Sequence, residues 1–215
     1  METNAPWRNV GLDRSEQHRL KRFAVLKAAS RAFAQKGYFQ TSLADIAKEF
    51  NLNKATLYHY FKSKEEILFE IHVHAIASIT DGEPMQNEAN ANGRERMEHF
   101  IDRYVAMLID DFGACLVLTD LKPLEKPSHD QCVAGRREID HLLRTILREG
   151  MNDGSLATVD PKSTAAFIFG ALNWICHWYH VDGEITPDML KRRALDFVLR
   201  SVESRSTNAG VPPTF

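Results

Sequence analysis

Apolar residues recur along most of the chain at intervals of three, four and seven positions, which is the spacing of amphipathic α-helices. Helices are predicted over residues 15–36, 43–50, 54–61, 64–79, 94–112, 114–121, 128–152, 163–180 and 187–202. Residues 80–93 contain Gly, Pro and Asn without an apolar period and are predicted to be a linker. The predicted fold is therefore all-α.

Two short helices joined by a tight turn are predicted within residues 41–64. Ser42 and Asp45 form a capping-box-like pair at the start of the first helix. Asn51 lies in the turn, because asparagine tolerates a left-handed backbone, and Asn53 is suited to cap the second helix. The apolar stripe of the first helix consists of Leu43, Ile46, Ala47 and Phe50.

The second of these helices carries two kinds of residue. Leu57 and Phe61 are four positions apart and can pack against the first helix. The polar residues left to face outward are Lys54, Thr56, Tyr58, His59 and Lys62. A short polar helix with a basic start, held at an angle by a tight turn, suits insertion into the major groove of DNA. The segment is therefore predicted to be a helix-turn-helix.

The segment KGYFQTSLADIAKEFNLNKATLYHYFKSKEEIL resembles the DNA-binding domain of the TetR family of transcriptional regulators. The matching residues are Gly37-Tyr38, Thr41-Ser42, Asp45-Ile46-Ala47, Thr56-Leu57-Tyr58, Phe61 and Ser63-Lys64-Glu65. The match is dense from Lys36 to Leu68, and beyond Leu68 it is one of helical layout only. Asn51 and Ala55 stand where the family often has glycine.

The resemblance implies a set of DNA-contacting residues. This set is Thr41, Ser42, Lys54, Ala55, Thr56, Tyr58, His59 and Lys64. Within it, Lys54, Thr56, Tyr58 and His59 are expected on bases or backbone, and Thr41 and Lys64 on phosphates. The resemblance also implies that the helix over 64–79 connects the DNA-binding domain to the body and transmits ligand binding. The expected domains are residues 15–62 for DNA binding and 63–204 for effector binding and dimerisation.

The two C-terminal helices are apolar on more than one side, and a helix of that kind must be covered on both sides. We therefore expect a dimer interface of four helices, two from each subunit, as the TetR resemblance also implies. The expected interface residues are Leu172, Ile175, Tyr179, Leu195, Val198 and Leu199. The alternative is a core formed entirely within one subunit.

The middle helices are expected to enclose an effector pocket with many aromatic and few polar residues. The candidate lining residues are Tyr104, Leu108, Leu118, Phe167, Trp174 and His177. The same stripe is also compatible with an ordinary core. The run GALNWICHWYH resembles the TetR regulators of lipid, fatty-acid or sterol catabolism, several of which respond to acyl-CoA thioesters.

Charge is divided unevenly along the chain. Residues 1–66 hold 12 Lys and Arg against 7 Asp and Glu, a net charge of +5, whereas the remaining 15 and 22 give −7. This division favours a basic DNA-binding module followed by an acidic body. Three widely spaced cysteines form neither a disulfide framework nor a zinc pattern, and no signal peptide or membrane span is evident. We expect a cytoplasmic protein with disordered tails over 1–14 and 205–215.

The sequence thus favours a ligand-responsive dimeric regulator, most simply a repressor of a palindromic operator that is released by a small apolar effector. Its expected partners are double-stranded DNA, the effector and a second copy of the chain, without a cofactor, a metal or a membrane. The alternative is a ligand-independent or non-specific DNA-binding protein. An enzyme is not predicted, because G-x-x-x-x-G-K, H-E-x-x-H and G-x-S-x-G motifs are absent.

Overall fold

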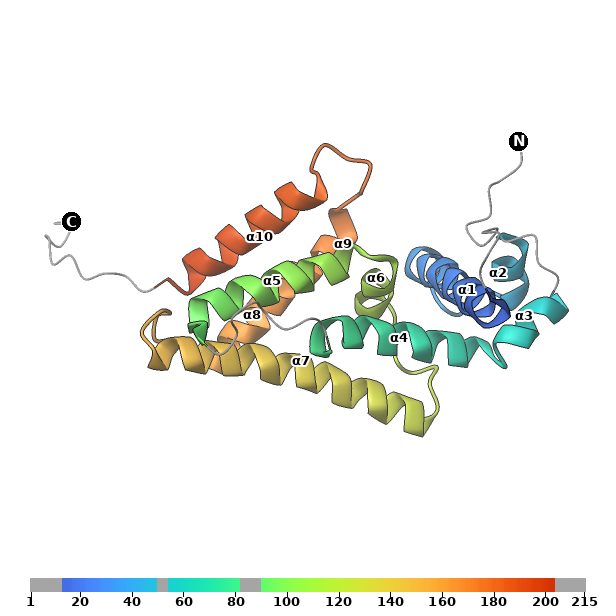
Figure 1. Cartoon of the computed structure of the whole chain (residues 1–215), viewed down its shortest axis with the longest axis horizontal. Helices are drawn as coiled ribbons and strands as arrows, with labels where there is room; N and C mark the ends of the chain where they lie inside the picture. Colours follow the sequence, from blue (N-terminus) through green and yellow to red (C-terminus); the bar gives the residue numbers. More distant parts are fainter. Residues whose placement is uncertain (1–12, 50–53, 82–89, 204–215) are drawn as a thin grey trace, which may run out of the picture.

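The computed structural model describes residues 13–49, 54–81 and 90–203, and within these ranges the chain forms helices and no strands (Figure 1). The all-α prediction is confirmed. The helices are α1 (Arg14–Lys36), α2 (Leu43–Glu49), α3 (Lys54–Tyr60), α4 (Lys64–Thr80), α5 (Gly93–Ile109), α6 (Asp111–Leu118), α7 (Lys126–Asn152), α8 (Pro161–Asn173), α9 (Ile175–Trp178) and α10 (Pro187–Ser201). The predicted disordered tails lie outside the described residues, except for Asp13 and Arg14, which cap and begin α1.

The helices form an elongated molecule with α1, α2 and α3 at one end (Figure 1). Helix α4 runs from this end into the body, where it packs against α6 and α7. Helix α10 lies along α5 at the opposite end. One continuous set of buried apolar side chains extends from Val25 in α1 to Val202 after α10. The two ends are therefore joined by packed core, with α4 as the direct connection.

Side chains that cap the helices explain most of the helix starts. Ser63 and Asp160 each accept a hydrogen bond from a backbone N–H in the first turn of α4 and α8. Pro161 and Pro187 stand in the first turn of α8 and α10, as predicted. Pro127 instead lies in the first turn of α7, so this helix begins two residues before its predicted start.

The predicted helix over residues 94–112 is wrong at its end, because α5 ends at Ile109. Asp110 has an extended backbone, caps α6 through Phe112 N–H, and lies 3.1 Å from Lys27 Nζ of α1. The chain turns there so that α6, which begins at Asp111, packs against both α1 and α4. A single carboxylate thus caps α6 and also joins the start of α6 to α1.

The predicted helix over residues 163–180 is also divided. Helix α8 ends at Asn173, and α9 begins at Ile175 after Trp174, whose N–H bonds to Leu172 O. The break leaves Ile175 buried and Trp174 61% exposed. Two residues predicted to lie on one continuous helix therefore face different surroundings.

Gly113 allows the close packing at the start of α6. A Cβ atom at this position would lie 1.9 Å from the carbonyl oxygen of Met107. We expect Gly113→Ala to lower the free energy of unfolding by about 1–3 kcal/mol, because the backbone must shift to admit the methyl group. Urea denaturation at fixed protein concentration measures this loss.

Gly135→Ala is the matched comparison within α7. Its Cβ would meet only side-chain carbons of Ile76, at 2.8 and 2.9 Å, and these can move more easily than backbone. We therefore expect a smaller loss of stability than for Gly113→Ala. Equal losses would contradict the proposed role of the Met107 carbonyl.

Candidate DNA-binding surface and effector cavities

The helix-turn-helix begins with the predicted capping pair. Asp45 N–H donates to Ser42 Oγ over 3.1 Å, and Ser42 N–H donates to Asp45 Oδ2 over 3.0 Å. The hydrogen bonds from the Ser42 side chain and backbone lower the pKa of the Asp45 carboxyl. The reciprocal pair fixes the start of α2.

Helix α3 packs as predicted, with Leu57 and Phe61 each 1% exposed. Tyr58 and His59 lie on its exposed side, and Tyr58 is 46% exposed. These two residues form an outward polar face next to the buried one. The positions Asn51 and Asn53 and the side chains of Lys54, Ala55 and Thr56 lie outside the described residues, so their predicted roles stay predictions.

Thr41 does not lie where it could contact phosphate, and this prediction is wrong. Its side chain is 1% exposed, and its hydroxyl lies 3.0 Å from Gly37 O and 3.3 Å from Ala32 O. Its N–H donates to Tyr38 O. The residue therefore secures the turn between α1 and α2. Ser42 beside it is exposed and remains a predicted contact.

Lys64 is tied to the same turn. Its Nζ donates to Tyr38 O over 2.9 Å and to Thr41 O over 3.1 Å, and it lies 4.0 Å from the centre of the Tyr38 ring. Partial burial lowers the pKa of the Lys64 ammonium. Since an ammonium has three N–H donors, one remains for a phosphate. Phe39, which follows Tyr38 in this turn, is 78% exposed.

Arg22 of α1 joins the recognition helix to α4, a role that sequence reasoning missed. Its guanidinium donates to Tyr60 O at the end of α3 and to Glu70 of α4, and lies 3.3 Å from Glu66. It also lies 4.1 Å from the centre of the Phe61 ring. The spacing of Glu66 and Glu70 by one helical turn was the available sequence signal.

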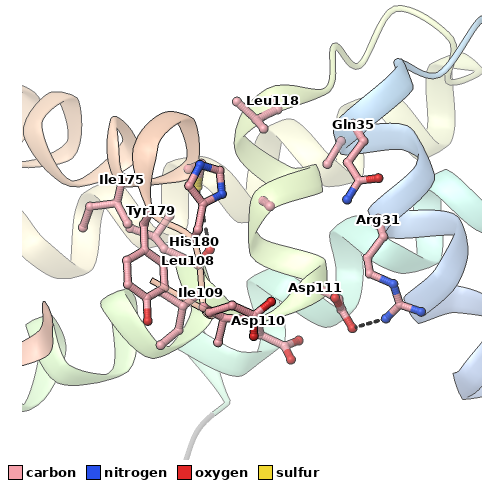
Figure 2. A pocket seen from close by; sticks show the side chains of 15 residues that line it. Arg31, Gln35, Leu108, Ile109, Asp110, Asp111, Leu118, Ile175, Tyr179 and His180 are labelled. Atoms are coloured by element: carbon pink, nitrogen blue, oxygen red, sulfur yellow. Dashed lines mark hydrogen bonds and ion pairs between the residues drawn. The ribbon is translucent and has the colours of Figure 1, made fainter. Parts of the chain in front are cut away.

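A cavity of about 400 Å³ lies between α1, α6, α9 and the residues after α9 (Figure 2). The predicted pocket residues Leu108 and Leu118 line it. Figure 2 shows Arg31 pointing toward Asp111, with Arg31 Nη1 and Asp111 Oδ2 2.8 Å apart. This cavity adjoins the DNA-binding end, and Arg31, Asp110 and Asp111 of its lining are already engaged in ion pairs.

A second cavity of about 260 Å³ lies within the body, between α5, α6, α7 and α8. Its lining consists of Tyr104, Leu116, Val117, Arg136, Ile139, Asp140, Phe169 and Asn173. Of the predicted pocket residues, Tyr104 lines this cavity. An arginine on an amphipathic helix normally faces solvent, but Arg136 of α7 lines the cavity and donates to Leu116 O over 2.7 Å. It does so because α4 packs against α7 and Leu116 of α6 supplies the accepting carbonyl.

Three further predicted pocket residues lie on the outer surface instead. Phe167 is 77% exposed, Trp174 is 61% exposed and His177 is exposed. Conversely, four predicted interface residues are buried inside the subunit: Leu172, Ile175, Val198 and Leu199. Tyr179 and Leu195 are half-buried and remain predictions. The apolar period of these helices does not say which face points inward, so the predicted burial of the two faces was wrong at these positions.

The geometry defines a helix-turn-helix DNA-binding protein with an attached helical body. Residues 25–71 match the family model for bacterial regulatory proteins of the TetR family, and residues 90–202 match the tetracyclin repressor-like C-terminal domain. The chain belongs to the TetR family of transcriptional regulators. Within the described residues, no helix has the length and apolar character needed to cross a membrane.

Relatives and solved structures agree with this assignment. The fatty acid metabolism regulator protein of Bacillus subtilis (strain 168) is 22% identical over 88% of this chain and 100% of its own length. The TetR regulator PfmR from Thermus thermophilus is 30% identical, with a TM-score of 0.70 over 82% of this chain and 97% of its own. AibR, solved with isovaleryl coenzyme A and operator DNA, is 22% identical with a TM-score of 0.70, covering 82% and 97%.

His72 of α4 makes stability depend on pH. Burial, together with the nearby Arg136 guanidinium, lowers the pKa of His72 to about 4. In the unfolded chain His72 binds a proton near pH 6.5, whereas in the folded protein it binds one only near pH 4. The free energy of unfolding therefore decreases as the pH falls from about 6.5 to about 4. The shift corresponds to about 3 kcal/mol. Urea unfolding at pH 7 and pH 4 should show a smaller loss in His72→Leu than in the wild type.

His141→Leu is the control for this measurement, because His141 is an exposed histidine of α7. It should keep the pH dependence of the wild type. A His72→Leu protein that loses stability as steeply as the wild type would contradict the assignment of this pH dependence to His72.

Proposed function

We propose that the chain is a dimeric, ligand-responsive repressor that binds a palindromic operator and is released by a small effector. Residues 15–62 form its DNA-binding domain and residues 63–204 its effector-binding and dimerisation domain. The observation that carries the proposal is the course of α4. Its start is joined to the recognition helix through Arg22, and its middle reaches the body cavity through His72 and Arg136. One rigid helix thus links both sites.

Exposed apolar side chains on the last helices support dimerisation. These residues, on α8, α9, the following turn and α10, are Phe167, Trp174, Trp178, Val181 and Phe197. A concentration of large apolar side chains on the surface is typical of a protein–protein interface. In the dimer, two recognition helices related by a two-fold axis read half-sites about 34–36 Å apart or a multiple of that distance.

The effector we propose is an acyl-CoA or another intermediate of lipid catabolism. The apolar lining of the body cavity supports an apolar group, and the name of the fatty acid metabolism regulator and the isovaleryl coenzyme A bound to AibR support an acyl compound. The effector shifts the body toward a state in which α4 separates the recognition helices. Only a ligand that prefers that state can release the DNA. The comparisons do not favour the alternative, a ligand-independent or non-specific DNA-binding protein.

Tyr58→Ala tests the recognition face. The operator is first selected from random and genomic DNA at near-physiological salt. We expect the variant to bind this operator at least about tenfold more weakly, because each subunit loses a contact in the groove. Fluorescence anisotropy measures this affinity, and sedimentation checks that the oligomeric state is unchanged. Normal operator binding by Tyr58→Ala would show that the recognition face is wrongly assigned.

Phe197→Glu tests the dimer surface. Phe197 is 57% exposed on α10, and we expect a carboxylate at an apolar interface to shift the protein toward monomer and to weaken operator binding at least about tenfold. Analytical ultracentrifugation measures the assembly. Phe39→Glu, at a similarly exposed phenylalanine of the DNA-binding end, should leave the assembly unchanged. A stable Phe197→Glu dimer would rule out this surface.

A further inference from the structure

Arg136 occupies an unusual position for a cation. It lies on α7 within the body, and no ion pair of the described residues includes it. Its Nη2 donates to Leu116 O of α6 over 2.7 Å and lies 3.2 Å from His72 Nε2 of α4. Burial lowers the pKa of its guanidinium. The guanidinium therefore donates to two neutral acceptors, and among the described residues the nearest carboxylate influence, that of Asp120, acts without a direct ion pair.

The hydrogen bonds of His72 determine which ring nitrogen carries the proton. Its Nδ1 lies 2.9 Å from Leu68 O, and a carbonyl oxygen only accepts, so Nδ1 carries the proton. Nε2 then has a free lone pair, which accepts from Arg136. The side chain is neutral and fully buried. The bond between Arg136 and His72 thus connects the cavity wall directly to α4.

The remaining polar groups of the cavity are already engaged with one another or with neighbouring side chains. Asp140 is paired with Arg144, with Nη2 and Oδ2 2.7 Å apart. The Tyr104 hydroxyl donates to Asn173 Oδ1 over 2.7 Å. The rest of the lining is apolar: Leu116, Val117, Ile139 and Phe169. The cavity therefore offers a cationic donor beside apolar walls, which suits a small apolar molecule that ends in an oxygen acceptor.

We propose that Arg136 anchors the effector by donating to its carboxylate or thioester carbonyl oxygen, and that this bond replaces the one to His72. The proposal rests on the ligand-responsive function given above and names the chemistry of its effector. With a volume of about 260 Å³, the cavity fits a short acyl group. Loss of the Arg136 bond frees the middle of α4, where the signal to the DNA-binding end begins.

This exchange makes a reciprocal prediction for His72. If the effector must displace His72 from Arg136, removing the histidine acceptor removes that cost. His72→Leu should therefore bind the effector more tightly than the wild type, while the effector changes its operator affinity less. By linkage, operator DNA should then also change the effector affinity of His72→Leu less than that of the wild type.

The decisive measurement is calorimetric binding of defined probes to the full-length protein. The first set of probes consists of butanoate, hexanoate and octanoate, and the second consists of the coenzyme A thioesters of the same acids. Comparison of the two sets shows whether Arg136 binds a free carboxylate or a thioester carbonyl. We expect Arg136→Gln to weaken binding of the responding probe at least about tenfold. Arg137→Gln removes the same charge from the exposed neighbouring residue and should bind as the wild type does.

Two further measurements distinguish loss of the anchor from poor folding of Arg136→Gln. Arg136→Lys keeps the charge but loses the planar fork of donors, and we expect intermediate affinity. Nitrogen NMR of His72 should show Nε2 losing its hydrogen bond when the probe binds the wild-type protein. An unchanged His72 signal in the bound protein would overturn the exchange.

The outcomes separate this inference from the proposed function. If a probe binds and releases the operator equally well in Arg136→Gln and in the wild type, the anchor is wrong and the ligand-responsive function stands. If no probe binds the wild type, the assigned effector chemistry is wrong. If a probe binds through Arg136 but never releases the operator, the anchor stands and the proposed response to ligand fails.

Discussion

The arrangement depends on how α4 is held along its length. At its start, the Arg22 guanidinium joins Glu70 to the end of the recognition helix, and in its middle His72 accepts from Arg136. On both sides of these polar contacts α4 presents a buried apolar face to the core, from Ile67 to Ile79. The apolar contacts stabilise the packing of α4 but depend little on its exact position, whereas the two guanidinium contacts fix where the helix lies. A change at either contact therefore alters the position of α4 more readily than its stability.

The sequence predicted those parts that short-range physics determines. The capping pair of Ser42 and Asp45, the buried positions Leu57 and Phe61 and the proline-started helices all follow from local spacing. Thr41 could not be predicted in this way. Its hydroxyl is buried because it donates to carbonyl oxygens of Ala32 in α1 and of Gly37, which caps α1. The local sequence pattern does not distinguish such a buried threonine from an exposed one.

The effector site was harder to predict for a related reason. Helix α8 is apolar on two sides, and the side that carries Ile168 and Leu172 is buried while Phe167 is exposed. Which side points inward depends on where α5 and α7 lie, and helical period contains no such information. The position of Arg136 could not be predicted for the same reason, since an arginine on an amphipathic helix is normally solvated, whereas here groups of α4 and α6 accept its hydrogen bonds.

A guanidinium buried against neutral acceptors costs stability that an apolar side chain would not. At this position of the cavity wall the half-buried Arg136 guanidinium donates to a carbonyl and a neutral imidazole and forms no ion pair with a described carboxylate. An incoming oxygen acceptor gains at such a position, because no carboxylate of the described residues forms an ion pair with this guanidinium. The imidazole that it displaces belongs to the helix that holds the recognition element. Binding free energy at the cavity thereby acts directly on the contact that positions α4.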